Sequence, residues 1–112
     1  IFKKGDMALL RPHHIEILGQ NVKEALTNIL KHSEATKVDI TLEVNNNYAR
    51  LHIKDNGKGF RNIREGLGIS GMRERAKYAG GILSVSGDEG FNMVCLIPMN
   101  DGGAIIEGAD SR

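Results

Sequence analysis

Three groups of residues in this sequence have types and spacings that suit phosphate and metal chemistry. The first group recurs at helical spacing and falls within a sector of about 80° on a helical wheel: Asn21, Glu24, Asn28 and Lys31. A carboxylate, an amide and an amine in successive turns offer a proton acceptor, a ligand for a hard cation such as Mg²⁺, and a partner for phosphate. The same residues also fit the solvated face of an ordinary amphipathic helix, so this face alone does not choose between the two.

The second group centres on Asp55, which continues the alternation of apolar residues at Ala49, Leu51 and Ile53. That alternation places Asp55 on the buried side of a strand, where a carboxylate needs hydrogen-bond donors from the protein or from a ligand. The next residues, Asn56-Gly57-Lys58-Gly59, allow a sharp turn and a close approach of the backbone. Asp55 therefore suits the floor of an adenine site, and it suits equally well the cap of an Asp-Asn-Gly turn.

The third group is a glycine-rich segment, Gly66-Leu67-Gly68-Ile69-Ser70-Gly71, which precedes a predicted helix. Free backbone N–H groups at such a helix N-terminus bind anions, and the helix dipole adds to the attraction. The pattern also occurs in dinucleotide-binding folds, but those require a parallel βαβ unit, and the flanking residues predict hairpins. Glycines that only form a loop and a helix cap are the remaining interpretation.

Hydrophobic periodicity predicts the elements that position these groups. A helix over residues 15–31 carries apolar residues at helical spacing, namely Ile15, Leu18, Val22, Ala25, Leu26, Ile29 and Leu30. Alternating apolar residues predict an antiparallel hairpin of strands 38–44 and 49–53, with Asn45-Asn46-Asn47 as its turn. A second helix over 70–79, ended by Gly80-Gly81, and a strand pair over 82–86 and 93–97 follow.

The order helix, hairpin, helix, hairpin indicates an α+β fold, a two-layer sandwich with helices on one face of a mixed, mostly antiparallel sheet. The 112 residues have room for one domain. We expect a lead-in at residues 1–14, in which Met7–Leu10 form a short strand or an approach segment. The folded domain is expected at residues 15–98 and a polar tail at 99–112.

Composition limits the class of protein. A formal net charge of +1 with scattered basic residues gives no reason to expect nucleic acid or an anionic membrane as the main partner. The single cysteine, Cys95, cannot form an internal disulfide, so a reducing, cytoplasmic setting is expected. No run approaches the roughly 18 apolar residues of a membrane span. The first residue is Ile1 rather than Met, which suggests a fragment of a longer protein whose membrane anchor, if any, lies elsewhere.

Together the three groups resemble the Bergerat-type ATP-binding domain shared by histidine kinases, type II topoisomerase ATPase subunits, mismatch-repair ATPases and heat-shock ATPase chaperones. Residues 24–32 resemble the asparagine box of that family, and residues 55–59 its first glycine box. Residues 66–75 resemble the second glycine box, in the form typical of histidine kinases that pair with helix-turn-helix response regulators. A short lid between Gly59 and Gly66 also suits that subfamily, and the likeness covers residues 15–98.

The resemblance implies a base end and a phosphate end of one nucleotide site. At the base end, Asp55 would accept from the adenine amino group, and Gly57 and Gly59 would shape the pocket floor. At the phosphate end, the lid and its backbone donors would come from Gly66, Gly68 and Gly71.

Side chains of the first predicted helix would complete the phosphate end. Asn28 would hold Mg²⁺, and Lys31 or His32 would neutralise phosphate charge. Glu24 would polarise the incoming nucleophile or orient the ligands of the metal, because a kinase must suppress hydrolysis.

One stretch departs from the family pattern, which often has a Gly-x-Gly-Thr turn before the last strand. Here it reads Asp88-Glu89-Gly90-Phe91, so one glycine is kept and the threonine hydroxyl is lost. Gly90 is expected to keep the turn, and the lost hydroxyl to lower nucleotide affinity.

The implied activity is that of a protein histidine kinase, which binds ATP and Mg²⁺ and phosphorylates a histidine on a dimerisation helix upstream of Ile1. The histidines of this chain match no acceptor motif: His13, His14, His32 and His52. A homodimeric full-length protein and a cognate response regulator are the implied partners. The alternatives are a serine kinase of the anti-sigma-factor type, a degenerate nucleotide-binding regulatory module, and an unrelated α+β interaction domain.

Overall fold

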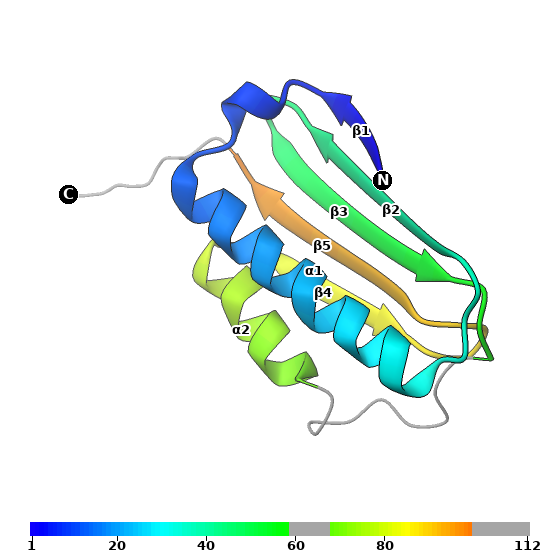
Figure 1. Ribbon diagram of the computed structural model, residues 1–112. Helices are drawn as coiled ribbons and strands as arrows, with labels where there is room; N and C mark the ends of the chain where they lie inside the picture. The colour runs from blue at the N-terminus through cyan, green and yellow to red at the C-terminus, as the bar shows by residue number, and fades with distance from the viewer. Residues whose placement is uncertain (59–67, 100–112) are drawn as a thin grey trace.

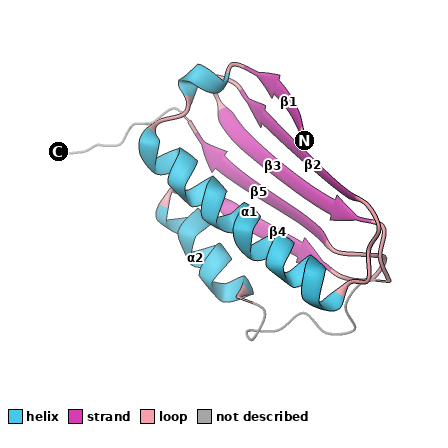
Figure 2. Ribbon diagram, viewed as in Figure 1, coloured by secondary structure: helices cyan, strands magenta, loops and turns pink. Residues whose placement is uncertain are grey.

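A computed structural model describes residues 1–58 and 68–99 of the chain. Two α-helices lie side by side on one face of a five-stranded sheet (Figures 1 and 2). The predicted α+β two-layer sandwich is therefore confirmed. Its elements are, in chain order, β1 (Phe2–Gly5), the 3-10 helix η1 (Met7–Leu9), α1 (Pro12–His32), β2 (Val38–Val44), β3 (Tyr48–Asp55), α2 (Ile69–Tyr78), β4 (Ile82–Ser86) and β5 (Asn92–Pro98).

The strands are arranged in the order β1-β2-β3-β5-β4. The predicted hairpin of β2 and β3 is confirmed, and Asn45 forms its turn by accepting hydrogen bonds from the N–H groups of Asn47 and Tyr48. β5 pairs antiparallel with both β3 and β4, so the last of the described strands in chain order lies inside the sheet. Only the β1–β2 pairing is parallel among these strands, which makes the sheet mixed and mostly antiparallel.

The first fourteen residues are more structured than a lead-in. Residues 2–5 add an edge strand to the sheet, and Phe2 lies opposite Thr41 of β2. The strand suggested for Met7–Leu10 was wrong, because this segment forms the 3-10 helix. The carboxylate of Asp6 accepts from the N–H of Ala8 at 3.0 Å, a local cap that favours a turn over an extended chain.

The helix predicted over residues 15–31 is confirmed as α1, which starts three residues earlier because Pro12 suits the first helical position. Its buried face was predicted only in part. Ile15 and Leu30 are 57% and 85% exposed, whereas Asn21, assigned to the polar face, is fully buried. The reason is the position of α2, which lies beside α1 on the Asn21 side and shifts the buried sector away from Ile15 and Leu30.

A single core lies between the helices and the sheet, where alternate residues of β3 and β5 face α1 and α2. These strands contribute Leu51, Ile53, Met93, Cys95 and Ile97, and the helices contribute Ile17, Leu18, Ala25, Ile29, Ile69, Met72 and Ala76. At 0–9% exposure such residues supply the main hydrophobic stabilisation of the domain. No helix within the described ranges is both long and apolar enough to cross a membrane.

The second predicted helix and its stop are also confirmed. α2 ends at Tyr78, and Gly80 follows with a φ of +80°. The N–H groups of Gly80 and Gly81 donate at 2.8 Å to the carbonyls of Lys77 and Ala76, which satisfies the open end of the helix. The predicted tail at residues 99–112 lies outside the described residues except for Met99.

His14 occupies an unusual position in the first turn of α1. Its side chain is 6% exposed, and its Nδ1 accepts from the N–H of Arg11 at 3.1 Å. The ring of His13 lies with its centroid 4.0 Å away. Burial lowers the pKa of His14 below its ordinary value of 6.5, and the charges of His13 and Arg11 lower it further.

A pH dependence follows from His14. Because its folded-state pKa is lowered, the unfolded chain takes up the proton more readily, so stability falls as the pH falls below about 6.5 and is unaffected by this group above that pH. Urea unfolding of the wild type and His14→Gln at pH 5.5 and 7.5 measures this. The variant should lose part of the acid sensitivity, and equal sensitivity in both proteins would contradict the assignment.

Gly19 gives a stability prediction. It lies within α1, and a Cβ built there meets nothing within 4 Å. Gly19→Ala should therefore raise the free energy of unfolding by about 0.5–1 kcal/mol, because alanine loses less backbone entropy in a helix. Chemical denaturation measures the change. Gly81→Ala is the matched control and should destabilise the protein, since its Cβ would overlap the Leu96 carbonyl oxygen.

Candidate nucleotide-binding site

Asp55 is the centre of the candidate site. It is the last residue of β3 and is 4% exposed, so its predicted inward orientation is confirmed. Its Oδ2 accepts from the hydroxyl of Ser33 at 2.7 Å. Its Oδ1 accepts from the N–H groups of Gly57 at 2.8 Å and Phe91 at 3.1 Å. Three donors from three chain segments thus converge on one buried carboxylate.

The loop after Asp55 packs against the end of α1 and is hydrogen-bonded to the segment that follows α1. The side chain of Asn56 accepts from the N–H groups of Thr36 and Lys37 at 2.9 and 3.0 Å. Gly57 lies so close to Ser33 that a Cβ at Gly57 would overlap the Ser33 hydroxyl and carbonyl oxygens. Both interpretations of the Asp-Asn-Gly sequence are therefore compatible with the structure: Asp55 caps this turn, and its carboxylate also lies in a buried polar site.

The altered turn before β5 still performs its structural task. Gly90 has a φ of +84°, and a Cβ there would lie 2.6 Å from the backbone oxygen of Asp55 and 2.8 Å from its Oδ1. Any side chain would therefore push this turn away from Asp55. Phe91, which is fully buried, then pairs its N–H with the Asp55 carboxylate and its carbonyl with the Asp55 N–H.

The polar residues of α1 differ in exposure. Asn28 is 4% exposed and Glu24 is half-buried, whereas Lys31 and His32 are exposed. Glu24 lies against the start of α2, because a Cβ at Gly68 would lie 2.6 Å from the Glu24 carboxyl group. Gly68 has a φ of +75° and is the N-cap residue of α2. The fold therefore brings the start of α2 to the acidic part of the α1 face.

The N-terminus of α2 presents backbone donors. Met72 donates to the carbonyl of Gly68 at 3.1 Å, but within the described ranges no hydrogen-bond acceptor is seen for the N–H groups of Ile69, Ser70 and Gly71. A Cβ at Gly71 would meet only the Arg75 Nη1 at an ordinary 3.6 Å. Packing among the described residues therefore does not require glycine at this position. Since these N–H groups have no acceptor among the described residues, they suit an anion.

The predicted site residues thus form two neighbouring groups along α1. Asp55 and Gly57 meet its C-terminal end, while Gly68 meets Glu24 one turn before Asn28. Gly59 and Gly66 lie outside the described residues. The sequence analysis did not predict Ser33 as a donor or the contacts of Gly90 and Phe91 with Asp55, because these contacts join segments far apart in the chain.

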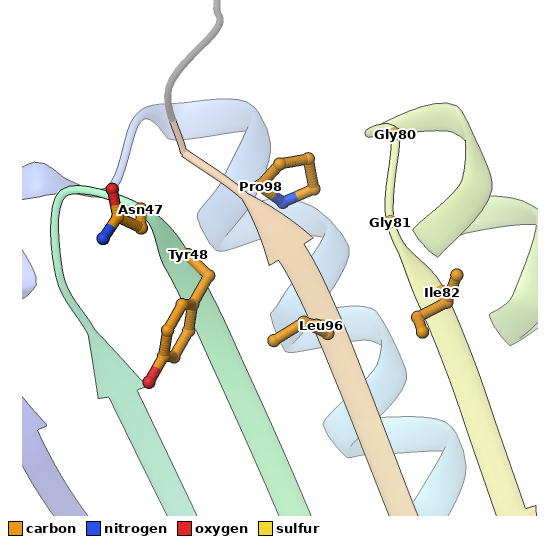
Figure 3. Close-up of a pocket in the computed structure, with 7 residues that line it drawn as sticks. All are labelled: Asn47, Tyr48, Gly80, Gly81, Ile82, Leu96 and Pro98. Atoms are coloured by element: carbon orange, nitrogen blue, oxygen red, sulfur yellow. The ribbon is translucent and has the colours of Figure 1, made fainter.

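A separate hollow of about 300 Å³ lies at the other end of the strands (Figure 3). Tyr48 and Pro98, which line it, are paired at the start of β3 and the end of β5, whereas Asp55 ends β3. The remaining lining residues are Asn47, Gly80, Gly81, Ile82 and Leu96. This hollow contains none of the predicted site residues.

Ser33 gives the stability prediction for the site. Ser33→Ala removes a donor from a buried carboxylate, so the free energy of unfolding should fall by about 2 kcal/mol. Thr27→Ala is the control, because the Thr27 hydroxyl donates at 2.9 Å to the Lys23 carbonyl of its own helix in an exposed position. Urea denaturation of both variants measures the difference. A loss no greater for Ser33→Ala than for Thr27→Ala would show that the Asp55 carboxylate does not depend on this hydroxyl.

Comparison with known sequences agrees with this geometry. Residues 13–101 match the family model described as histidine kinase-, DNA gyrase B-, and HSP90-like ATPase. The chain is 42% identical over 72 residues to the sensor histidine kinase LiaS of Bacillus subtilis, covering 62% of this chain and 20% of LiaS. It is 36% identical over 95 residues to the sensor histidine kinase YvfT of the same organism, covering 84% of this chain and 26% of YvfT. The chain therefore spans about a quarter or less of these relatives.

Solved structures show the same fold. The ATP-binding domain of PrrB from Mycobacterium tuberculosis aligns with a TM-score of 0.61 at 27% identity, over 77% of this chain and 69% of that domain. The blue-light activated histidine kinase of Erythrobacter litoralis aligns with a TM-score of 0.69 at 20% identity, over 90% of this chain and 35% of that protein. The chain belongs to the family of histidine kinase-, DNA gyrase B- and HSP90-like ATPases, and over its matched residues it is similar to a part of the sensor histidine kinases LiaS and YvfT.

Proposed function

We propose that this domain binds ATP with Mg²⁺ and donates the γ-phosphoryl group to a histidine on a separate dimerisation helix, in two-component signal transduction. The observation that carries the proposal is the buried carboxylate of Asp55, which has three donors among the described residues. Family membership supports ATP as the nucleotide, and the names of the curated relatives support histidine phosphorylation.

Among the described residues, the donors to the Asp55 carboxylate leave one acceptor position unfilled. An ionised carboxylate offers about four acceptor positions, and Ser33, Gly57 and Phe91 fill three of them. The open position is on Oδ2, which accepts only from Ser33 among the described residues. The amino group of adenine is a donor that suits this position, while a purine with a carbonyl oxygen there would face the carboxylate with a second acceptor.

The phosphate end of the proposed site combines α1 and α2. Mg²⁺ usually takes one or two oxygens from the protein and the rest from water and phosphate, so a buried amide such as Asn28 beside Glu24 suits it. When bound, the metal would neutralise charge on the phosphates. The N–H groups at the start of α2 would bind phosphate oxygens, and Lys31 or His32 would add positive charge. Gly59 and Gly66 would complete the pocket floor and the lid.

Glu24 has the proton-handling role in this proposal. It is half-buried and lies against Gly68, where it can orient the ligands of the metal or polarise the imidazole of an incoming histidine. Direct transfer to histidine requires that water is not activated in its place. Whether the domain phosphorylates histidine or hydrolyses ATP is decided by which nucleophile, imidazole or water, reaches the γ-phosphorus in line.

The phosphorylated histidine is proposed to lie on another segment of the parent protein. His14 is buried in the cap of α1, and His52 shares a 2.8 Å hydrogen bond with Asn92 on the sheet face opposite the helices. We propose that residues 15–98 act as the catalytic unit in the cytoplasm. Its partners would be its own dimerisation and phosphoacceptor helices, in a homodimer, and a cognate response regulator.

The direct test is calorimetric titration of the domain with ATP and Mg²⁺. Asp55→Asn should lower affinity by at least about tenfold, or 1.4 kcal/mol. The substitution replaces one accepting oxygen by an NH2 group, which cannot accept a hydrogen bond from the surrounding donors or from the adenine amino group. Asp39→Asn is the matched control, since Asp39 is an exposed aspartate on β2, and should leave affinity unchanged. Asn28→Ala should remove the gain that Mg²⁺ gives. A folded wild-type domain that binds no ATP would overturn the proposal.

A second titration does not depend on the folding of a variant. Inosine triphosphate carries a carbonyl oxygen where ATP carries the amino group, so the wild type should bind it more weakly by at least about tenfold. Equal affinity for the two nucleotides would show that Asp55 does not contact the base.

A further inference from the structure

The side chain of Asn21 is the one polar group on α1 that the proposed nucleotide site does not use and that the described structure buries completely. Both halves of its amide are occupied. Its Oδ1 accepts from Nε of Arg75 on α2 at 2.9 Å. Its Nδ2 donates to the backbone oxygen of Met72 at 3.5 Å and faces the Cys95 sulfur of β5 at 3.7 Å. Burial raises the pKa of the Cys95 thiol, so this sulfur is a neutral acceptor.

This contact fixes α2 in a particular position along α1. Leucine at position 21 would fill a core position without the cost of burying an amide, so packing alone does not favour asparagine here. The amide adds directionality, because it can reach both the Arg75 side chain and the Met72 carbonyl at only one register of the two helices. The guanidinium of Arg75 also extends back toward the first turn of α2, where its Nη1 lies 3.6 Å from a Cβ position at Gly71.

The same register sets the start of α2 against Glu24. Asn21 and Glu24 lie three residues apart on α1, and their partners Met72 and Gly68 lie four residues apart on α2. The two contacts are therefore successive steps between adjacent helices. Side-chain hydrogen bonds are seen at the Asn21 step, whereas the Glu24–Gly68 step shows none among the described residues.

We propose that Asn21 and Arg75 are positioning residues that hold the N-terminal N–H groups of α2 at the phosphate end of the nucleotide site. This inference rests on the proposed function. Neither residue needs to touch the nucleotide. The contact keeps the α2 donors where a phosphate would lie, and a shift of about 1 Å at that end is enough to weaken a preorganised anion site. The base end at Asp55 does not involve α2, so it is independent of this contact.

A role in packing alone makes a different prediction. If the contact only stabilised the fold, variants that remain folded would bind every part of the nucleotide as the wild type does. If it positions the phosphate donors, the same variants would lose affinity for ATP and keep affinity for adenosine, which has no phosphates. The ratio of the two affinities separates these roles.

The experiment measures binding of ATP with Mg²⁺ and of adenosine to the 112-residue chain. The variants are Asn21→Leu, which keeps a buried side chain of the same branched shape, Arg75→Met, which keeps the aliphatic stem, and the two combined. Lys77→Met is the matched control, because it removes the same charge from an exposed position on α2. Circular dichroism and urea denaturation establish that each variant is folded, and Arg75→Met carries the test if Asn21→Leu does not fold.

The expected result is a loss of at least about tenfold in ATP affinity for each single variant, with adenosine affinity changed less than about twofold. The double variant should be no weaker than the worse single variant, since both remove one contact. Unchanged ATP affinity in folded variants, or a parallel loss of ATP and adenosine, would overturn the positioning role and leave the proposed function intact. A wild-type chain that binds neither ligand would overturn both.

Discussion

The buried carboxylate of Asp55 imposes the requirement that most of the domain is arranged to meet. A carboxyl group with 4% of its surface exposed is costly to bury unless hydrogen-bond donors surround it. Here the donors come from the end of α1, from the loop after β3 and from the start of β5. Two of these approaches leave no room for a side chain, which accounts for glycine at positions 57 and 90. The donors to Asp55 are therefore assembled by the same packing that forms the fold.

α1 connects the two ends of this site. One helix supplies apolar side chains to the core, the Ser33 donor at its end, and the polar face that includes Asn28 and Glu24. Because α2 lies against that polar side, the helix buries amides as well as aliphatic groups and leaves Ile15 and Leu30 in contact with solvent. The exposure of these apolar residues and the burial of the polar ones have one cause, which is the side of α1 that α2 covers.

The sequence predicts the features that depend on local pattern. Alternation along β3 predicts that Asp55 points inward, and helical spacing predicts α1 and the neighbours of Asn28. It does not predict β1, since Phe2–Gly5 carries two lysines and a glycine and shows no alternation, and its pairing partner lies about forty residues away. Nor does it predict the burial of Asn21, because a helical wheel orders the faces of a helix without showing which neighbour covers each one.

The hydrogen-bonded partners of Asp55 show the same limit. Ser33 and Phe91 lie 22 and 36 residues from the aspartate, and nothing in their own surroundings marks them as donors to it. What the sequence does carry is the glycine beside one of them, Gly90, whose positive φ is required by the close approach. The family resemblance predicts that residues 24–32, 55–59 and 66–75 belong to one site, whereas the contacts of Ser33, Gly57 and Phe91 with Asp55 are seen only in the structure.

The place of β5 in the sheet has a consequence for how the domain folds during synthesis on the ribosome. β5 follows the other described strands along the chain, yet it lies between β3 and β4 and brings Phe91 to Asp55. While the chain emerges from its N-terminus, α1 with β1, β2 and β3 can associate, but the inner edge of β3 stays open and is prone to pair with other chains. The carboxylate gains its last backbone donor only when β5 enters. The described donors to Asp55 are therefore complete only after β5 has been synthesised, in the same event that pairs the open edge of β3.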